Sequence, residues 1–237
     1  MLFAAGLGTR LKPFTDSHPK ALAPVNGKPL LQRNIEYLAG YGIEDIIINT
    51  HHFAEQIVDF LDAQDNFGLR ITVSHEAGEP LETGGGLKYA GWFFRDSDKP
   101  FVVMNADILT NLDLPSMVKD HETHRPLATL AVTNRKSSRN FLFNDAMELC
   151  GWTNLQTGET RMSRSADGRL QPLAFSTVHV IEPALIPLIT QEGKFSIVDT
   201  YLDLAREHRI RGYRHDQDIV VDVGRPESVT EAEKYFQ

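Results

Sequence analysis

The chain has 237 residues, of which 41% are hydrophobic, and its formal net charge at pH 7 is −8. This length and apolar share suit a single packed domain over residues 1–237. The acidic balance argues against a nucleic-acid or membrane-surface binder, because such proteins are usually basic.

Cys150 is the only cysteine, so no internal disulfide can form. A single thiol fits a reducing compartment, and we expect a cytoplasmic protein. No apolar run approaches the roughly 20 residues that span a bilayer, and no signal peptide is expected ahead of the first strand. Nothing in the composition fixes the oligomeric state, for which we expect a monomer or a small homo-oligomer.

Strands and helices alternate in the first half of the chain, which predicts βαβ units and a mostly parallel sheet. The β-branched run at 45–49 is typical of a buried strand, and Ala54–Ala63 has the period of an amphipathic helix. In chain order we expect strands at 2–5, 45–49, 69–74 and 101–105, and helices at 29–39, 54–63 and 87–94, the last opened by glycines 84–86.

The second half changes character, since short apolar runs alternate with turns. This pattern predicts antiparallel strands that form a small additional lobe. We expect strands at 128–133, 141–143, 147–152, 173–180, 210–213 and 219–222, and helices at 183–190, 197–208 and 226–236.

The first twenty residues carry the most specific motif. An apolar run enters Gly6-Leu7-Gly8-Thr9-Arg10, and Lys20 follows one loop later. Glycines let backbone N–H groups approach an anion closely, while Arg10 can fork onto phosphate oxygens and Lys20 supplies a point charge. The stretch therefore predicts a polyphosphate cradle.

Two better-known glycine motifs do not fit this stretch. A P-loop requires Gly-Lys-Ser/Thr after its spacer, and a dinucleotide fingerprint requires a small residue at position 11, which is Leu11. For Gly6 and Gly8 alone, an ordinary strand-to-helix turn with exposed cations is the alternative.

The stretch from Ala4 to Lys20 resembles the signature of the sugar-1-phosphate nucleotidyltransferases, and three later stretches match that family in order: 79–86, 105–107 and 221–227. The chain looks closest to the short branch without a C-terminal β-helix, which includes N-acetylmuramate-1-phosphate uridylyltransferases. The mannose-1-phosphate and heptose-1-phosphate guanylyltransferases of bacteria are near relatives. The resemblance implies an α/β, Rossmann-like three-layer fold with a mostly parallel central sheet and a small antiparallel sugar-binding lobe. It divides the chain into a nucleotide-binding part, about 1–125, and a sugar-binding part, 126–237.

Two aspartates match the metal positions of the family. The resemblance implies that Asp107, after the strand at 101–105, and Asp222, before the Gly-x-Pro-Glu turn, hold Mg²⁺, the expected cofactor. One or two carboxylates plus substrate oxygens are the usual ligands of Mg²⁺ beside phosphates. Without the family match, each aspartate would be read as a turn or helix-entry residue.

The remaining site residues also follow from the resemblance. It implies catalytic roles for Arg10, Lys20 and Asp107, and nucleotide contacts from Ala5, Gly6, Gly8, Thr9, Arg10, Lys20, Glu79, Thr83, Gly84 and Asn105. Asn140 and Thr177 match strands that contact the sugar, although ordinary strand polarity would also explain them. The alternative for Asn105 is a cap at a strand end, and for 79–86 a glycine-rich helix entry. His51 and His52 are adjacent in an extended segment and do not predict a metal pair.

These matches predict an enzyme that joins a nucleoside triphosphate to a sugar 1-phosphate and releases pyrophosphate. The Glu-Thr-Gly-Gly-Gly form at 82–86 is more similar to the uridylyltransferase branch, so we expect UTP with N-acetylmuramate 1-phosphate, which would place the enzyme in cell-wall recycling. The alternatives are a guanylyltransferase that uses GTP with mannose or heptose 1-phosphate, and a non-catalytic sugar-nucleotide sensor. The sensor reading predicts loss of a key charge, yet Arg10, Lys20, Asp107 and Asp222 are all present.

Overall fold

A ten-stranded mixed sheet forms the centre of the protein in a computed structural model, which describes residues 1–165 and 168–237. Four parallel strands form one side of this sheet, in the order β5 (Arg70–His75), β4 (Asp45–Thr50), β1 (Leu2–Phe3) and β6 (Phe101–Asn105). Because the carboxyl ends of parallel strands meet at one edge, the residues that follow these strands lie close together.

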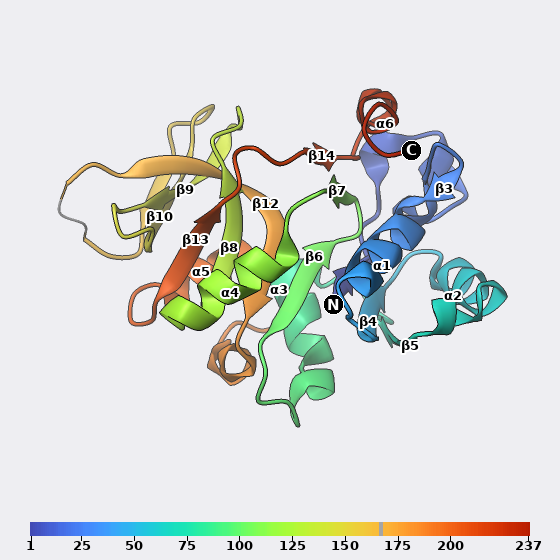
Figure 1. The fold of residues 1–237 in the computed structure, drawn as a ribbon, viewed down its shortest axis with the longest axis horizontal. Helices are drawn as coiled ribbons and strands as arrows, with labels where there is room; N and C mark the ends of the chain where they lie inside the picture. The colour runs from blue at the N-terminus through green and yellow to red at the C-terminus, as the bar shows by residue number, and fades with distance from the viewer. Residues whose placement is uncertain (166–167) are drawn as a thin grey trace.

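Antiparallel strands extend the sheet beyond β6. Strand β12 (Gln171–Ile181) pairs antiparallel with β6, and also pairs with β8 (Ala128–Thr133) and β9 (Arg139–Phe143). The sheet continues through β10 (Leu149–Asn154) and β11 (Thr160–Met162), while β13 (Ile210–Arg214) joins β8 in parallel. Strands β9 and β10 form the lobe on the left of Figure 1.

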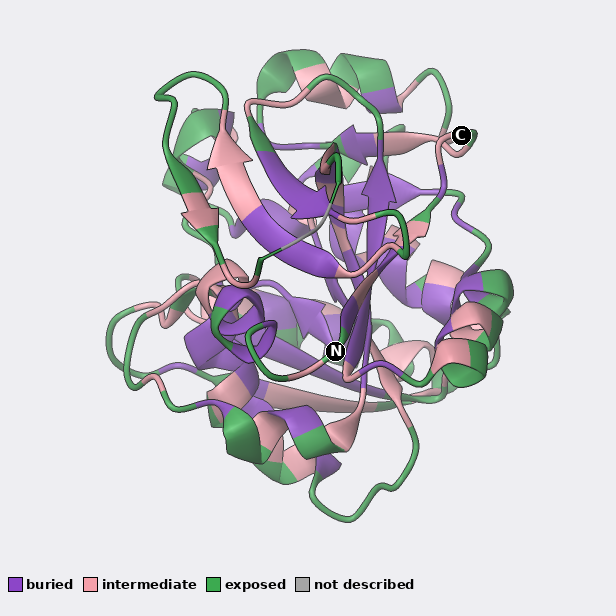
Figure 2. Ribbon diagram, turned by 90° about the vertical axis from the view of Figure 1, so that its left-hand side faces the viewer, coloured by how far each residue is buried: buried purple, intermediate pink, exposed green. Residues whose placement is uncertain are grey.

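Helices cover both faces of the sheet, and each strand sends alternate side chains to the two faces. Leu2, Ile46 and Ile48 pack with α1 (Leu30–Gly40), α2 (Ala54–Ala63) and α4 (Leu114–His124). Phe3 and Ile47 pack on the opposite face with α3 (Glu82–Tyr89) and α5 (Ile197–Leu204). The strands are accordingly buried, and the helices show their exposed sides outward (Figure 2). The expected three-layer α/β fold is confirmed.

A small second sheet returns the end of the chain to the carboxyl edge of the parallel strands. Strand β7 (Ile108–Thr110) pairs antiparallel with β14 (Val220–Asp222), which crosses from the lobe towards α6 (Pro226–Ala232) in Figure 1. The hairpin of β2 (Pro24–Val25) and β3 (Lys28–Pro29) packs beside α6. This return places residues 222–225 next to the segment that follows β6.

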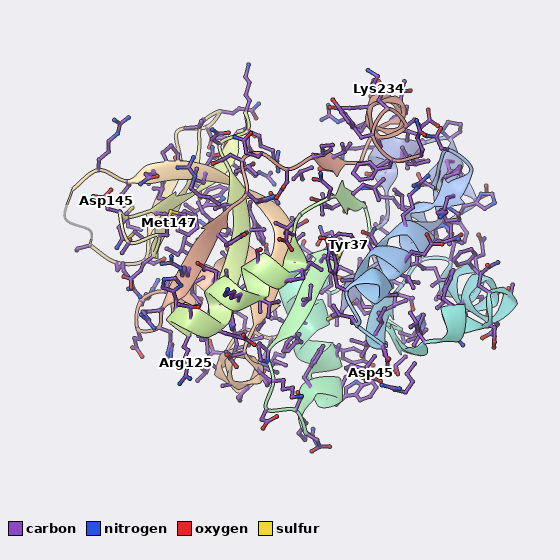
Figure 3. The ribbon with its side chains drawn as sticks, in the orientation of Figure 1. Tyr37, Asp45, Arg125, Asp145, Met147 and Lys234 are labelled. Carbon is purple, nitrogen blue, oxygen red and sulfur yellow. The ribbon has the colours of Figure 1, made fainter. Side chains whose placement is uncertain are left out.

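Several predicted boundaries were wrong for local reasons. The three glycines 84–86 lie inside α3, which ends at Tyr89 and continues as a 3₁₀ helix at Ala90–Phe94. The segment Pro183–Leu188 is a 3₁₀ helix, because Pro187 has no N–H to continue an α-helix. Met147 lies in the turn before β10 with a positive φ of 58° and is not part of a strand (Figure 3).

Helix α4 and the short strands β2, β3, β7 and β11 were not predicted at all. Strand β1 ends at Phe3, and α5 and α6 end at Leu204 and Ala232, earlier than expected. Across residues 1–165 and 168–237, every helix is too short or too polar to cross a bilayer.

Candidate active site

The carboxyl ends of β1, β4 and β6 open on a pocket of about 410 Å³. The predicted metal ligand Asp107 lines it together with most of the predicted nucleotide-binding residues: Ala5, Gly6, Gly8, Thr9, Arg10, Lys20, Thr83 and Asn105. Its other lining residues are Phe3, Leu7, Asn49, Pro80, Glu82, Lys194 and Gly224. The fold therefore brings the glycine loop, Lys20 and the segment after β6 into one cavity.

Gly8 shapes the loop that follows β1. Its φ of +63° is a left-handed conformation, and a Cβ there would stand 2.8 Å from both Lys20 Cβ and Thr15 Cγ2. The Gly8 carbonyl accepts hydrogen bonds from Thr15 Oγ1 and from the Leu11 N–H, each at 2.9 Å. Only glycine allows this turn to lie against Lys20. A Cβ on Gly6, in contrast, would meet nothing within 4 Å, so the space where a side chain would project is open.

Lys20 and Asp107 form an ion pair at the base of the pocket. The Lys20 side chain is almost wholly buried, and Asp107 follows β6 by two residues. The pair places a cation and a carboxylate at the carboxyl edge of the sheet, where an anionic ligand would meet them.

Asp222 lies beside Asp107 although 115 positions separate them in the sequence. Asp222 stands opposite Ile108 in the β7–β14 pair, and the Val223 N–H donates a 2.8 Å hydrogen bond to the Asp107 carbonyl. A Cβ on Gly224 would lie 2.8 Å from Asp222 Oδ1 and 2.9 Å from Arg10 Nη2. The missing side chain at Gly224 lets the Arg10 guanidinium approach the end of β14.

The two aspartates fit a divalent cation. Asp107 Oδ1 is buried and, in the part of the chain that the structure describes, has no hydrogen-bond partner. Such an atom is costly unless a ligand satisfies it. Among the described residues, no cluster of three or more His, Cys, Asp or Glu side chains could hold a metal. Two carboxylates with substrate oxygens suit Mg²⁺, which keeps water and phosphate ligands.

The loop before α3 forms the opposite wall. Pro80, Glu82 and Thr83 line the pocket, whereas Glu79 does not. Gly84 is buried, and its N–H donates to the Phe195 carbonyl at 3.0 Å. Nucleotide contacts from Glu79, Thr83 and Gly84 stay predictions.

Two buried polar residues at the pocket, Asn49 in its lining and Glu76 next to it, were missed by sequence reasoning. Asn49 Oδ1 accepts from the Ala4 N–H at 2.8 Å, and Asn49 Nδ2 donates to Glu76 Oε1 at 2.7 Å. The second carboxylate oxygen of Glu76 accepts from the Leu81 N–H at 2.8 Å. This chain of bonds joins the start of the glycine loop to the loop before α3. Both residues follow apolar strand runs, and that position could have identified them.

The two predicted sugar residues differ in placement. The Asn140 amide donates to the Ser137 carbonyl at 3.0 Å, so it is engaged within its own turn. Thr177 has a φ of 54° and a buried hydroxyl without a partner among the described residues. Val178 pairs with Met104, so Thr177 lies beside Asn105, whose Oδ1 is also buried and unpartnered there. Strained, unsatisfied residues of this kind concentrate at functional sites.

Residues 1–141 match the family model described as nucleotidyl transferase, which is more than half of the chain. The chain belongs to the nucleotidyl transferase family. An N-acetylmuramate alpha-1-phosphate uridylyltransferase from Caulobacter vibrioides is 31% identical over 98% of this chain and 94% of its own length. The predicted family and enzyme class, a sugar-1-phosphate nucleotidyltransferase, are confirmed.

Other relatives match with different coverage. A mannose-1-phosphate guanyltransferase from Yarrowia lipolytica is 26% identical over 95% of this chain and 60% of its own length. A UTP–glucose-1-phosphate uridylyltransferase from Synechocystis is 36% identical over 55% of this chain and only 36% of its own length. HddC from Yersinia pseudotuberculosis complexed with GMP-PN superimposes with a TM-score of 0.76 over 100% of this chain and 98% of that protein. At 22% identity, that likeness shows the fold alone.

Arg135 adds a cation on the lobe side of this nucleotidyl transferase. Its Nη2 donates to the Phe175 carbonyl at 2.9 Å. Burial lowers the pKa of Arg135, while the charge of Asp222 acts in the opposite direction. The Arg135 guanidinium therefore lies near Asp222, the second predicted metal ligand. No sequence motif had identified Arg135 as a site residue.

A larger hollow of about 630 Å³ lies beside α2 and contains none of the predicted site residues. His51 lines it and bonds the Glu76 carbonyl through Nδ1 at 2.9 Å. That contact gives His51 a structural partner between β4 and α2.

Proposed function

We propose that this nucleotidyl transferase is a Mg²⁺-dependent uridylyltransferase that joins UTP to N-acetylmuramate 1-phosphate and releases pyrophosphate. The observation that carries the proposal is the meeting of Lys20 and Asp107 in a pocket walled by the glycine loop and the loop before α3, with Asp222 at the adjoining end of β14. The similarity to the Caulobacter uridylyltransferase along almost the whole of both chains favours this substrate pair.

The residues present suit nucleotidyl transfer. An oxygen of the sugar phosphate forms a bond to the α-phosphorus of the nucleotide, and the bond to the bridging oxygen of the β-phosphate breaks. Pyrophosphate leaves with the electron pair, so no covalent enzyme intermediate is needed. Positioning and charge neutralisation dominate such reactions.

Each charged group has a place in this scheme. The 5–10 loop and Arg10 hold the β- and γ-phosphates, and Lys20 neutralises charge at the α-phosphate. Asp107 and Asp222 would hold Mg²⁺, and the bound ion would supply positive charge to the reacting phosphates. Thr83 faces the base, Asn105 the ribose or a phosphate, and Thr177 the sugar.

A guanylyltransferase that acts on mannose 1-phosphate is the second candidate. Its support is the Yarrowia guanyltransferase, which matches 95% of this chain. The chemistry would be unchanged, and only the partners of the base loop and the lobe would differ.

The proposal is tested by measuring pyrophosphate release with Mg²⁺ across UTP, GTP, dTTP and CTP. Each nucleotide is paired with the 1-phosphates of N-acetylmuramate, N-acetylglucosamine, glucose and mannose. We expect the highest kcat/KM with UTP and N-acetylmuramate 1-phosphate. A maximum with GTP and mannose 1-phosphate would keep the mechanism and refute the substrate pair. Tight nucleotide binding without pyrophosphate release from any pair would indicate a non-catalytic sensor.

A further inference from the structure

The segment 193–197 is docked on the loop before α3 through its backbone. The Phe195 carbonyl accepts hydrogen bonds from the N–H groups of Gly84 and Gly85, at 3.0 and 3.2 Å, and the Phe195 N–H donates to the Leu81 carbonyl at 3.1 Å. The Ile197 N–H donates to Thr83 Oγ1 at 3.0 Å. Four bonds therefore fix this segment against a wall of the nucleotide pocket.

Gly84 and Gly85 of α3 permit this close contact because they lack side chains. A Cβ on Gly84 would lie 2.5 Å from the Phe195 ring, and a Cβ on Gly85 would lie 2.3 Å from the Gly193 carbonyl oxygen. Real Cβ atoms do not approach backbone atoms so closely, so a side chain at Gly85 would displace the segment. The backbone of Lys194, which lies between Gly193 and Phe195, is consequently held in a fixed position.

Lys194, in the docked segment, lines the same pocket as Lys20 and Asp107. Lys20 is paired with Asp107, whereas Lys194 makes no ion pair within residues 1–165 and 168–237. The acidic neighbour Glu192 is bound instead by Lys88, at 2.5 Å. Lys194 is exposed to solvent and therefore available to an anionic ligand.

The position of Lys194 favours the acceptor over the nucleotide. The segment leads into α5, which packs against both α3 and lobe strand β10, and Asp199 of α5 bonds Arg161 of the lobe at 2.6 Å. Lys194 thus stands where the base loop meets the lobe. In the proposed function, the glycine loop, Arg10 and Lys20 already bind the phosphates of the nucleotide.

We infer that Lys194 is a specificity-determining residue that binds an oxyanion of the sugar 1-phosphate. The inference rests on the proposed function. Every acceptor of this class carries a phosphate, and N-acetylmuramate also carries a lactyl carboxylate, so the shared chemistry is an oxyanion that accepts hydrogen bonds from an ammonium group.

The test compares Lys194→Ala with Lys119→Ala, which removes an exposed lysine from α4. The KM values for N-acetylmuramate 1-phosphate, N-acetylglucosamine 1-phosphate and UTP are measured for both variants and the wild type. Loss of one charge-assisted contact should raise the acceptor KM about 10-fold and leave the UTP KM within about 2-fold. A rise for both acceptors identifies the phosphate as the bound group, and a rise confined to N-acetylmuramate 1-phosphate identifies the carboxylate.

Lys194→Arg keeps the charge and should recover most of the acceptor affinity. Unchanged acceptor KM values in Lys194→Ala would overturn the inference, as would an equal rise in the UTP KM or an equal effect of Lys119→Ala. The proposed function is tested separately, by the turnover of the wild type with UTP and N-acetylmuramate 1-phosphate. A wild type that uses neither acceptor would refute the proposed substrate pair, and the two lysine variants would then be compared on the sugar 1-phosphate that the wild type does use.

Discussion

Two residues without side chains fix the positions of the charged groups in this pocket. Gly8 takes a left-handed conformation that lets its loop lie on Lys20, and Gly224 leaves room for Arg10 beside Asp222. The charges are therefore held by backbone shape as well as by ion pairs. Such pre-organisation is what an electrostatically assisted transfer requires.

The first prediction concerns Lys20. Lys20→Ala should lower kcat by about 10²–10³-fold, because the α-phosphate loses a buried, pre-positioned cation. Circular dichroism should show an unchanged fold. Lys12→Ala, which removes an exposed lysine paired with Asp16 on the surface, is the control and should keep kcat. Near-normal turnover of Lys20→Ala would exclude a catalytic role for this lysine.

A second prediction concerns the metal. Asp222→Asn removes one of two carboxylates that converge beside β7, so the Mg²⁺ concentration for half-maximal rate should rise about 10-fold or more. The comparison is made by titrating Mg²⁺ at fixed, saturating nucleotide. Asp59→Asn on α2 should leave the titration unchanged. Identical Mg²⁺ curves for Asp222→Asn and wild type would show that Asp222 is not a ligand.

At the scale of elements, α3 and the segment 193–197 behave as one unit. Gly85→Ala should force them apart, because its Cβ would meet the Gly193 carbonyl. We expect a loss of about 1–3 kcal/mol in the free energy of unfolding, measured with urea, and an increased KM for the nucleotide. Gly40→Ala, where a Cβ meets nothing within 4 Å, is the control. Equal stability of the two variants would refute the close contact.

Individual elements differ in how well the sequence predicts them. Helix α2 and strands β6 and β8 have the predicted bounds, because their apolar periods are regular. Helix α4 was missed because its buried side has only Leu114, Met117 and His121, and a buried histidine does not register as apolar. The purpose of Gly84 and Gly85 was also hidden, since it depends on their contact with the distant segment 193–197.

At the scale of the molecule, a buried histidine links stability to pH. Burial lowers the pKa of His179 to about 3, with a smaller effect from the Met1 ammonium, and its Nδ1 bonds the Tyr201 hydroxyl. The folded state thus excludes a proton that the unfolded state binds below about pH 6.5. Stability is present in full above pH 6.5 and falls as the pH drops towards 3.

The expected loss from this residue is about 2 kcal/mol between pH 6.5 and pH 5, at about 1.36 kcal/mol per pH unit. Urea unfolding of wild type, His179→Gln and His18→Gln at both pH values measures it. His179→Gln should be less stable than wild type at pH 7 but less sensitive to pH, while His18→Gln on the surface should follow wild type. The same pH dependence in all three proteins would rule out His179 as the source.

The site as a whole could be predicted only in part. The glycine loop, Lys20 and Asp107 lie on local motifs, and their meeting follows from the edge of a parallel sheet. Arg135 and Lys194 enter through contacts between distant segments, for which one sequence carries no signal. The proximity of Asp222 to Asp107 depended on the family pattern, and the β7–β14 pairing now gives its physical basis.

The most direct measurement uses UTP labelled with ³²P at the α-phosphate, incubated with the protein, Mg²⁺ and N-acetylmuramate 1-phosphate. Direct nucleotidyl transfer predicts that the label moves into a sugar nucleotide, that unlabelled pyrophosphate appears in equal amount, and that both products form about 10²–10³-fold more slowly with Lys20→Ala. Label that remains in UTP, or is released as UMP without acceptor, would contradict the account.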